Sequence, residues 1–336
     1  MAKHGKVVIV KIGINGFGRI GRLALRAALK ENMEVVGIND ITDSETLAYL
    51  LKYDSIHGRF DGEVSSDGNS LSVDGKKIPV SSERDPSKLD WGKLGAEVIL
   101  ECTGLFRTKK EASKHIQAGA KKVLISAPAK DHDGTFIPGI NSDKYDRANH
   151  HVISIGSCTT NCLAPLVKVL LENFGLVQGY MTTIHAYTSD QRLQDTPHQD
   201  LRRARAAAVS MIPTTTGAAK AISEIFPELK GRMDGTAVRV PTICGSLVDL
   251  SAIVEKEVTT AEVNEAFKAA AADPNLSAAL EYCQDPIVSV DVLGNPHGSI
   301  LDSKMTWAKG KMVKLFSWYD NEWGFSCRMI DMLKIM

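Results

Sequence analysis

Short apolar runs alternate with amphipathic stretches through the first half of the chain. Runs rich in β-branched residues occupy residues 7–14, 34–38, 97–102, 122–126 and 151–155. Between several of them, apolar side chains recur at helical spacing in residues 19–31, 44–53 and 108–117. Continuous apolar strands separated by helices are typical of a mostly parallel sheet that helices cover on both faces. The pattern therefore predicts an α/β domain over residues 1–157.

The pattern changes after residue 158. A helical stretch runs to about residue 175, and longer strand patterns follow at residues 180–187, 236–240, 246–258, 287–293 and 311–319. Helical spacing interrupts them at 205–210, 217–225 and 260–271. Long strands with few helices between them predict an α+β domain with a mixed or antiparallel sheet over residues 158–324. The amphipathic tail, residues 325–336, is expected to form a helix that packs with the first domain.

Composition narrows the class of protein. Hydrophobic residues make up 43% and charged residues 24% of the 336 positions, as in ordinary globular proteins. Forty basic residues offset forty acidic ones, whereas a dedicated nucleic-acid binder usually has a basic surplus. No apolar run approaches the ~20 residues that cross a bilayer. The six scattered cysteines have neither zinc spacing nor the density of a disulfide scaffold. We expect a cytoplasmic protein with no metal, no membrane segment and no primary role in nucleic-acid binding.

A glycine motif follows the first predicted strand and opens a helix. In Gly16-Phe17-Gly18-Arg19-Ile20-Gly21, the glycines suit a tight turn, close approach to a pyrophosphate, and close helix–strand packing. Asp40 ends the next strand, nineteen residues past Gly21. A carboxylate there accepts a hydrogen bond from the ribose 2′-hydroxyl of NAD and repels the 2′-phosphate of NADP. The alternative is a glycine-rich turn with an acid that caps the next helix. Strand, loop, helix and acid in this order favour an NAD site.

Cys158 begins the helical stretch of the second half. A helix N-terminus stabilises a thiolate through its dipole and N–H groups. With NAD, such a thiolate is typical of aldehyde oxidation, in which hydride leaves a hemithioacetal and an acyl-thioester remains. The reaction needs a base, and His185 at the end of strand 180–187 is the best candidate. The residues alone leave open that both side chains only pack in the core.

Several motifs of this chain resemble those of the glyceraldehyde-3-phosphate dehydrogenase family. They span residues 14–22, 52–55, 126–128, 157–165, 214–220, 239–242 and 318–324, and the resemblance runs from about Val7 to the C-terminus. It implies a Rossmann domain, a catalytic domain, and oxidation of glyceraldehyde 3-phosphate to 1,3-bisphosphoglycerate with NAD and inorganic phosphate. The alternative is erythrose-4-phosphate dehydrogenase, which hydrolyses the thioester. The intact run Thr214-Thr215-Thr216-Gly217 favours phosphate as the acceptor.

The resemblance also implies a role for each matching residue. Cys158 is expected to be the acylated nucleophile and His185 its base. The residues expected to contact NAD are Gly16, Phe17, Gly18, Arg19, Ile20, Asp40, Arg84, Ser126 and Asn321. Two anion sites, for the substrate's phosphate and the attacking phosphate, are expected from Ser157, Thr159, Thr188, Arg203, Thr216, Gly217 and Arg239. Spacing does not decide among Arg202, Arg203 and Arg205, and we choose Arg203. A homotetramer is expected, with residues 191–203 reaching a neighbour's cofactor site.

Three segments depart from the residues usual in that family. Ile155-Gly156 stands where Asn-Ala is usual, Ile243-Cys244-Gly245-Ser246 follows Thr242 in place of Asn-Val-Ser, and Phe325-Ser326-Cys327 replaces Tyr-Ser-Asn. None removes a group that the chemistry needs, so they are expected to affect the rate rather than the reaction.

Overall fold

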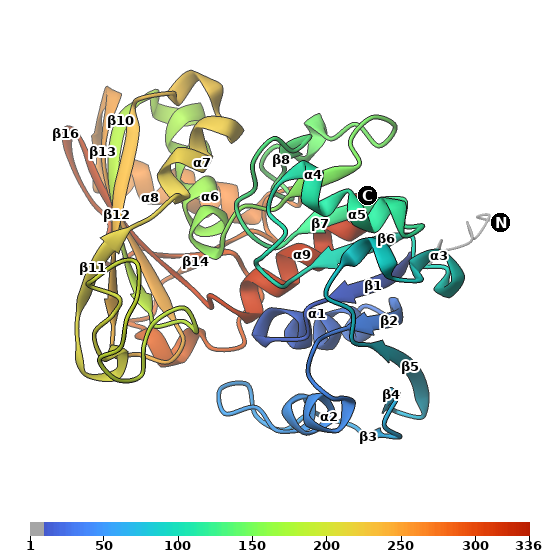
Figure 1. Cartoon of the computed structure of the whole chain (residues 1–336). Coiled ribbons are helices and arrows are strands. Elements are labelled where there is room, and N and C mark those ends of the chain that lie inside the picture. Colours follow the sequence, from blue (N-terminus) through green and yellow to red (C-terminus); the bar gives the residue numbers. More distant parts are fainter. Residues whose placement is uncertain (1–9) are drawn as a thin grey trace. The chain divides into compact units, whose positions relative to one another are not determined.

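The structure, a computed structural model, describes residues 10–336, so residues 7–9 of the first predicted strand lie outside it. The chain divides into two units (Figure 1). The described part of unit 1 comprises residues 10–133, Asp146–Ser154 and Met329–Met336, and unit 2 comprises Gly134–Tyr145 and Ile155–Arg328. The segment Gly134–Tyr145, expected in the first domain, groups with unit 2 because Ile137 and Ile140 belong to the core of that unit.

The sheet of unit 1 is mainly parallel, with strands in the order β3-β4-β5-β2-β1-β6-β7-β9. The central strand β1 pairs in parallel with β2 on one side and β6 on the other, so the strand order reverses there. The carboxyl ends of these strands share one edge, where α/β folds bind their ligands. The strands are β1 (Lys11–Asn15), β2 (Glu34–Asn39), β3 (Val64–Ser66), β4 (Ser70–Val73), β5 (Lys76–Ser81), β6 (Val98–Glu101), β7 (Lys122–Ile125) and β9 (Val152–Ser154).

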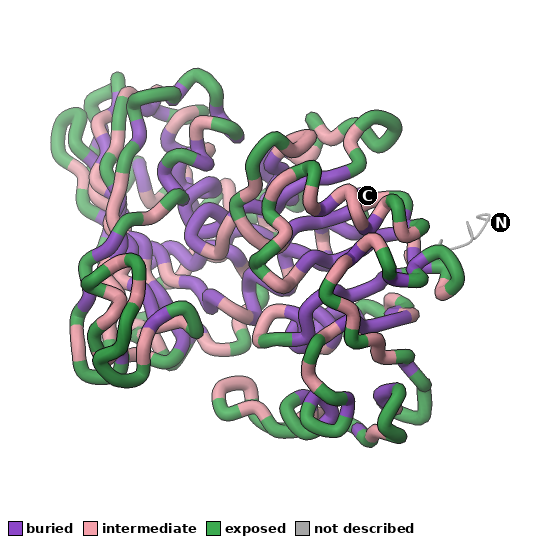
Figure 2. Tube along the Cα trace, in the orientation of Figure 1, coloured by how far each residue is buried: buried purple, intermediate pink, exposed green. Residues whose placement is uncertain are grey.

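The helices of unit 1 are α1 (Arg19–Lys30), α2 (Ser44–Lys52), α3 (Trp91–Leu94), α4 (Lys109–Ala112) and α5 (Lys114–Gln117), with a 3-10 turn η1 (Pro86–Lys88). The predicted helix 108–117 is divided at Ser113 into α4 and α5. Ile12 and Ile14 of β1 are fully buried, as are Leu23 and Leu25 of α1. Figure 2 shows this burial along the central strands. Buried apolar side chains along β1 are what the continuous apolar run predicted.

Unit 2 has a mixed sheet in the order β11-β12-β10-β13-β16-β15-β14. β10 runs parallel to β12 and antiparallel to β13, and β13 runs antiparallel to β16. The strands are β10 (Leu176–Ala186), β11 (Ile212–Thr215), β12 (Met233–Val240), β13 (Ser246–Thr259), β14 (Leu280–Cys283), β15 (Ser299–Asp302) and β16 (Trp307–Tyr319). The short β8 (Gly134–Thr135) is in unit 2 but is not a strand of this sheet. The two sheets confirm the predicted fold class.

Three helices lie on one face of the unit 2 sheet (Figure 1): α6 (Cys158–Phe174), α7 (Ala218–Ile225) and α8 (Thr260–Ala272). Leu163, Leu166 and Leu170 of α6 are buried in one core with apolar residues of β13 and β16. Helix α9 (Trp323–Ile335) begins in unit 2, and its residues from Met329 on group with unit 1. The 3-10 turns are η2 (Ser142–Lys144), η3 (Ala207–Val209), η4 (Pro227–Leu229) and η5 (Ser289–Val292). Among the described helices, none has the length and apolar character needed to span a membrane.

Two predicted elements of the second half are wrong. Residues 287–293 are not a strand but contain η5, because the Asp291 carboxylate accepts a hydrogen bond from the Val288 N–H at 2.8 Å and bends the chain. Residues 205–210 hold only the turn η3 and no α-helix. Val209 is 80% exposed, so no core stabilises a longer helix there.

Candidate active site

The backbone requires two of the three glycines of the loop motif in unit 1, and the third, Gly18, faces open space. Gly16 has φ +89°, and a Cβ there would lie 2.7 Å from the backbone nitrogen of Thr103. A Cβ on Gly21 would collide with the carbonyl oxygen of Gly16, so the helix packs directly on the turn. A Cβ on Gly18 would meet open space, and no side chain caps α1 there. The exposed start of α1 therefore offers backbone N–H groups to an anion.

Asp40 lies against this loop. Its carboxylate accepts hydrogen bonds from the Phe17 N–H at 2.7 Å and the Thr42 N–H at 2.9 Å. Asp40 follows the end of β2, which pairs with β1, so the acid stands beside the strand that leads into the loop. The open start of α1 at Gly18 fits the pyrophosphate of a dinucleotide, and the Asp40 carboxylate fits a ribose.

The Arg19 side chain is paired with an acid of the same unit. Its guanidinium forms an ion pair with Asp54. Burial opposes ionisation of Asp54, but hydrogen bonds from Arg19, His57 and Ile56 lower the pKa of this carboxyl to about 2. Arg19 is the first residue of α1, directly after Gly18.

Two further predicted NAD residues follow strands of the same sheet. Ser126 comes directly after β7, and its hydroxyl donates to the Glu101 carbonyl at 2.9 Å. Arg84 is exposed and comes three residues after β5, which pairs in parallel with β2. Ile20 is half-buried in the first turn of α1. Asn321 belongs to unit 2 and is described with that unit below.

A buried polar network under the loop was not predicted from the sequence. Glu101 is 1% exposed, and its carboxylate accepts from the Asn15 amide at 2.6 Å and from the Thr103 N–H at 2.9 Å. His115 Nε2 lies 2.9 Å from the same carboxylate, and the Trp91 indole N–H donates to His115 Nδ1 at 3.0 Å. Because Nδ1 is an acceptor, Nε2 carries the proton and donates to Glu101. The signal in the sequence was an acid at the end of an otherwise apolar strand.

In unit 2, Cys158 is the first residue of α6. Ser157 caps this helix, since its hydroxyl accepts from the Thr160 N–H at 3.1 Å and its N–H donates to Thr160 Oγ1 at 3.3 Å. The Cys158 Sγ lies 3.4 Å from His185 Nε2, near the end of β10. The structure thus brings together the two residues that the sequence analysis paired.

His185 is fixed by its neighbours in the sheet. His185 on β10 is the register partner of Arg239 on β12, so both side chains leave the sheet on the same face. His185 Nδ1 lies 2.6 Å from the Ala186 carbonyl oxygen and 3.1 Å from Arg239 Nη1. A protonated Nδ1 donates to the carbonyl and cannot accept from Arg239, so the two contacts exclude each other. The shorter contact favours a proton on Nδ1, which leaves Nε2 as an acceptor facing the thiol.

Electrostatics favours neutral forms of this pair. Burial raises the pKa of the Cys158 thiol, and the positive charge of Arg239 opposes that shift. Burial and then the charge of Arg239 lower the pKa of His185 to about 3. His185 is therefore an uncharged imidazole near pH 7, ready to accept a proton at Nε2. An anion bound to Arg239 would offset one cause of its low basicity.

Tyr319, which lies in the motif 318–324 and for which no role was predicted, packs against His185. Its ring meets His185 edge to face, with centroids 5.9 Å apart. Its hydroxyl lies 3.0 Å from Thr159 Oγ1 and 2.8 Å from Thr183 Oγ1. The Thr159 side chain is thus positioned by Tyr319, and a Thr159 hydroxyl that accepts from Tyr319 keeps its own proton for an anion.

Arginine and threonine side chains gather beside His185. Arg239 Nη1 donates to Thr188 Oγ1 at 3.0 Å, and the Thr188 hydroxyl bonds Asp190. Asp190 also accepts from Arg203 Nη1 at 2.6 Å. Arg239 Nε is buried and has no partner within residues 10–336. Two guanidinium groups and a donor that lacks a partner form a site suited to an anion.

Of the three candidate arginines, only Arg203 joins this cluster. Arg202 is exposed and reaches the Pro213 carbonyl at 3.5 Å, and Arg205 is exposed and pairs with Asp195. Thr216 and Gly217 stand at the start of α7 and directly follow Thr215, whose carbonyl accepts from Arg203 Nη2 at 3.3 Å. The Thr216 hydroxyl accepts from the Ala218 N–H at 3.2 Å, and a Cβ on Gly217 would meet open space. This start of α7 offers backbone N–H groups to a second anion.

Comparison with known proteins identifies the family. A model of the glyceraldehyde 3-phosphate dehydrogenase NAD binding domain matches residues 10–109, and a model of the C-terminal domain of the same enzyme matches residues 157–321. Glyceraldehyde-3-phosphate dehydrogenase of Geobacillus stearothermophilus is 59% identical over 325 residues, 96% of this chain and 97% of the relative. The Streptomyces coelicolor enzyme is 56% identical over 326 residues, with the same shares covered.

The chain belongs to the glyceraldehyde-3-phosphate dehydrogenase family. It is an NAD-dependent oxidoreductase, and its cofactor is NAD.

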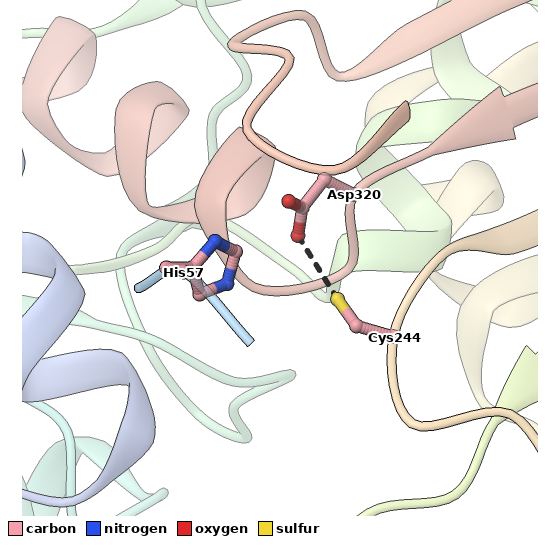
Figure 3. A group of neighbouring side chains, drawn as sticks. All are labelled: His57, Cys244 and Asp320. Atoms are coloured by element: carbon pink, nitrogen blue, oxygen red, sulfur yellow. Dashed lines mark hydrogen bonds between the residues drawn. The ribbon is translucent and has the colours of Figure 1, made fainter. Parts of the chain in front are cut away.

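One departure from the family's usual residues lies beside Asn321. Cys244 is buried, and Figure 3 shows its thiol directed at the Asp320 carboxylate, with Sγ 3.3 Å from Oδ1. Burial, Asp320 and Glu322 raise the pKa of this thiol. The Asn321 Oδ1 accepts from the Gly245 N–H at 3.1 Å and Ser246 Oγ at 2.9 Å. These contacts orient the Asn321 amide so that its NH₂ group is the part left to donate to a ligand.

The departure nearest Cys158 has a local explanation. Gly156 has φ +72°, a left-handed conformation that glycine adopts without strain. Ile155 is fully buried, and its carbonyl accepts from the Asn161 amide at 2.9 Å. Asn161 also bonds the Ser157 carbonyl at 2.9 Å. The turn before Cys158 is thus held by the Asn161 side chain, whose contacts do not depend on an Asn side chain at position 155.

Proposed function

We propose that this chain is the phosphorylating enzyme, which oxidises D-glyceraldehyde 3-phosphate to 1,3-bisphosphoglycerate with NAD and inorganic phosphate. The observation that carries the proposal is the Cys158 Sγ–His185 Nε2 contact of 3.4 Å at the start of α6. The anion cluster of Thr188, Arg203 and Arg239 borders this pair through Arg239. A nucleophile beside an anion site suits an aldehyde that carries a phosphate.

The first step joins sulfur to the aldehyde carbon. His185 Nε2 accepts the Cys158 proton as Sγ attacks, and the proton passes to the carbonyl oxygen to give a thiohemiacetal. The substrate's phosphate on Arg239 offsets the charge that lowers the pKa of His185, so substrate binding strengthens the base.

The second step is oxidation. His185 Nε2 accepts the hydroxyl proton of the thiohemiacetal as the C1 hydrogen leaves with its electron pair. Bound NAD supplies the acceptor for that hydride. The product on the enzyme is an acyl-thioester of Cys158.

In the third step, a phosphate oxygen attacks the thioester carbon and the Cys158 sulfur leaves with the electron pair of the C–S bond. His185 returns its proton to the sulfur, so the pair is restored. We propose that the attacking phosphate is held by the start of α7 at Thr216 and Gly217 and by the start of α6 at Ser157 and Thr159. Both are helix N-termini with N–H groups suited to an anion.

For NAD, we propose that the loop 16–21 binds the pyrophosphate and that Asp40 binds a ribose. Arg84 and Ser126 are proposed to line the same sheet edge, and the Asn321 amide to donate to the nicotinamide. The supporting observations are the open position at Gly18 and the Asp40–Phe17 hydrogen bond. The Asn321 contact rests on the resemblance and on its oriented amide.

We also propose that four copies assemble. The face of the unit 2 sheet opposite α6 carries half-exposed or exposed apolar side chains, including Tyr180, Ile253, Met312 and Phe316. A hollow of about 270 Å³ on this face is lined by Tyr180, Ile253 and Met312 together with Arg232 and Asp234. A second copy of the sheet suits such a surface.

A cytoplasmic location stays a prediction.

NADH formation from glyceraldehyde 3-phosphate, with and without inorganic phosphate, tests the proposal. Sustained turnover that needs phosphate is expected. Turnover without it indicates thioester hydrolysis and makes erythrose 4-phosphate the next substrate. The variant Cys158→Ser is expected to lose turnover and keep NAD binding, and His185→Asn to slow the first burst of NADH by about 10²- to 10⁴-fold. Wild-type turnover in Cys158→Ser would contradict the assigned nucleophile.

A further inference from the structure

Arg203 is held on three of its nitrogens. Its Nε donates to Thr214 Oγ1 at 3.0 Å, its Nη1 to Asp190 Oδ2 at 2.6 Å, and its Nη2 to the Thr215 carbonyl at 3.3 Å. A guanidinium has five N–H groups. These bonds leave one N–H on each terminal nitrogen, which is the fork that binds two oxygens of one phosphate.

The hydroxyl of Thr214 links Arg203 to a second carboxylate. Thr214 Oγ1 lies 2.6 Å from Asp200 Oδ2, and the Asp200 carboxylate lies 3.6 Å from Arg203 Nε. An ionised carboxylate only accepts, so the single hydroxyl proton of Thr214 points to Asp200 and a lone pair faces Arg203 Nε. The order is therefore fixed: Arg203 donates to Thr214, and Thr214 donates to Asp200.

The Thr214 hydroxyl, which links Arg203 to Asp200, belongs to a buried residue on the same face as Arg239. Thr214 is 8% exposed and lies on β11, where Ile212, two residues earlier, pairs with Arg239. Side chains two residues apart on a strand share a face. Thr214 and Arg239 therefore lie on the same face of the sheet, whereas Thr215 lies on the exposed face. The Asp200 carboxylate is itself held by the Arg202 N–H at 2.9 Å.

We propose that Thr214 and Asp200 are positioning residues that hold Arg203 in the orientation with which it binds the phosphate of the aldehyde substrate. The inference deepens the proposed function and rests on it. A long arginine side chain loses conformational entropy when it is fixed on binding. Thr214 and Asp200 fix Nε before the substrate arrives, so binding loses less entropy.

The test compares a substrate with a phosphate and one without. In Thr214→Val, which keeps the shape and removes the hydroxyl, the KM for glyceraldehyde 3-phosphate is expected to rise about tenfold, with kcat within about twofold of wild type. The kcat/KM for unphosphorylated glyceraldehyde is expected to stay unchanged, because that substrate makes no contact with Arg203. Thr214→Ser restores the hydroxyl and is expected to restore the KM. Thr215→Val is the matched control, because Arg203 bonds its carbonyl and not its side chain.

A second variant covers the case in which Thr214→Val does not fold. Asp200→Ala is expected to raise the same KM, and the double variant with Thr214→Val is expected to be no worse than Thr214→Val alone, since Asp200 acts through the hydroxyl.

The outcomes separate the two proposals. If the wild-type enzyme does not turn over glyceraldehyde 3-phosphate, the proposed function fails. If the wild type does and both variants keep its KM, the positioning role is overturned. An equal loss of kcat/KM for both substrates would indicate a general structural role and would also overturn it.

Discussion

At the scale of single residues, Asp54 couples stability to pH. Hydrogen bonds outweigh burial and lower its pKa to about 2, against an ordinary 3.8. A lowered carboxyl pKa stabilises the fold above the ordinary pKa, and this stability is lost as pH falls towards 2. Asp54→Asn is therefore expected to cost roughly 2 kcal/mol at pH 7 and about half of that at pH 3. Urea unfolding at both pH values measures this.

The exposed carboxylate of Asp61 provides the control for that prediction. Asp61→Asn removes the same charge a few residues away and is expected to change the unfolding free energy at neither pH. A penalty for Asp54→Asn that is equal at pH 3 and pH 7 would show that the lost stability does not come from the ionised carboxylate.

Residues that stand in a motif could be predicted from the sequence. Residues whose contacts arise only when distant segments fold together could not. Cys158 and His185 were paired because a helix start and a strand end suit a nucleophile and a base, and they lie 3.4 Å apart. The contact between Glu101 and His115 joins the end of a strand to a helix fourteen residues later, and no local pattern marks it. The ion pair between Arg19 and Asp54 joins residues 35 positions apart, and no motif marks it either.

At the scale of elements, the capping boxes of α6 and α8 allow an effect on stability to be distinguished from an effect on turnover. Ser157 caps α6, and Thr259 caps α8 with hydrogen bonds to and from Glu262. Ser157→Ala and Thr259→Ala are each expected to destabilise the protein by about 1 kcal/mol, because each leaves an N–H of the first turn without its cap. Only Ser157→Ala is expected to lower turnover, by about tenfold or more, because α6 presents Cys158 at its first position. Thermal unfolding and steady-state kinetics of both variants measure this, and equal turnover in both would contradict it.

Elements with strong periodicity were predicted well, and those stabilised by side-chain contacts were not. α1 and β13 follow from their apolar spacing. The strands β3, β4 and β5 were missed because they are only 3 to 6 residues long and are partly exposed. Residues 287–293 alternate like a strand, but Asp291 caps the turn there instead. A polar side chain that bonds its own backbone overrides the apolar pattern.

At the scale of the whole molecule, two domains were predicted because helix and strand periods change near residue 158. The place of Gly134–Tyr145 could not be predicted in this way, since Ile137 and Ile140 are buried in a core formed mainly by residues after 158. Periodicity also does not predict whether copies of the chain associate. Alternate residues of β13 and β16 are half-exposed in the single chain, and only the sheet order shows that they form one face.

That face is where the proposed tetramer can be tested. Met312 on β16 is the register partner of Ile253 on β13 and is 43% exposed. Met312→Glu places a charge in the middle of this apolar surface, and burying an unpaired charge between copies costs several kcal/mol. The variant is expected to leave the tetramer for smaller species in light scattering, with its circular dichroism unchanged.

Val290, which is 64% exposed on η5 and off the sheet face, is the matched site for the same substitution. Val290→Glu is expected to keep the wild-type mass of four chains of 36.4 kDa. A Met312→Glu variant that also keeps that mass would show that this face is not an interface between copies. Loss of the tetramer in both variants would mean that the effect comes from added charge rather than from the surface around Met312, so only the difference between them supports assembly through the sheet.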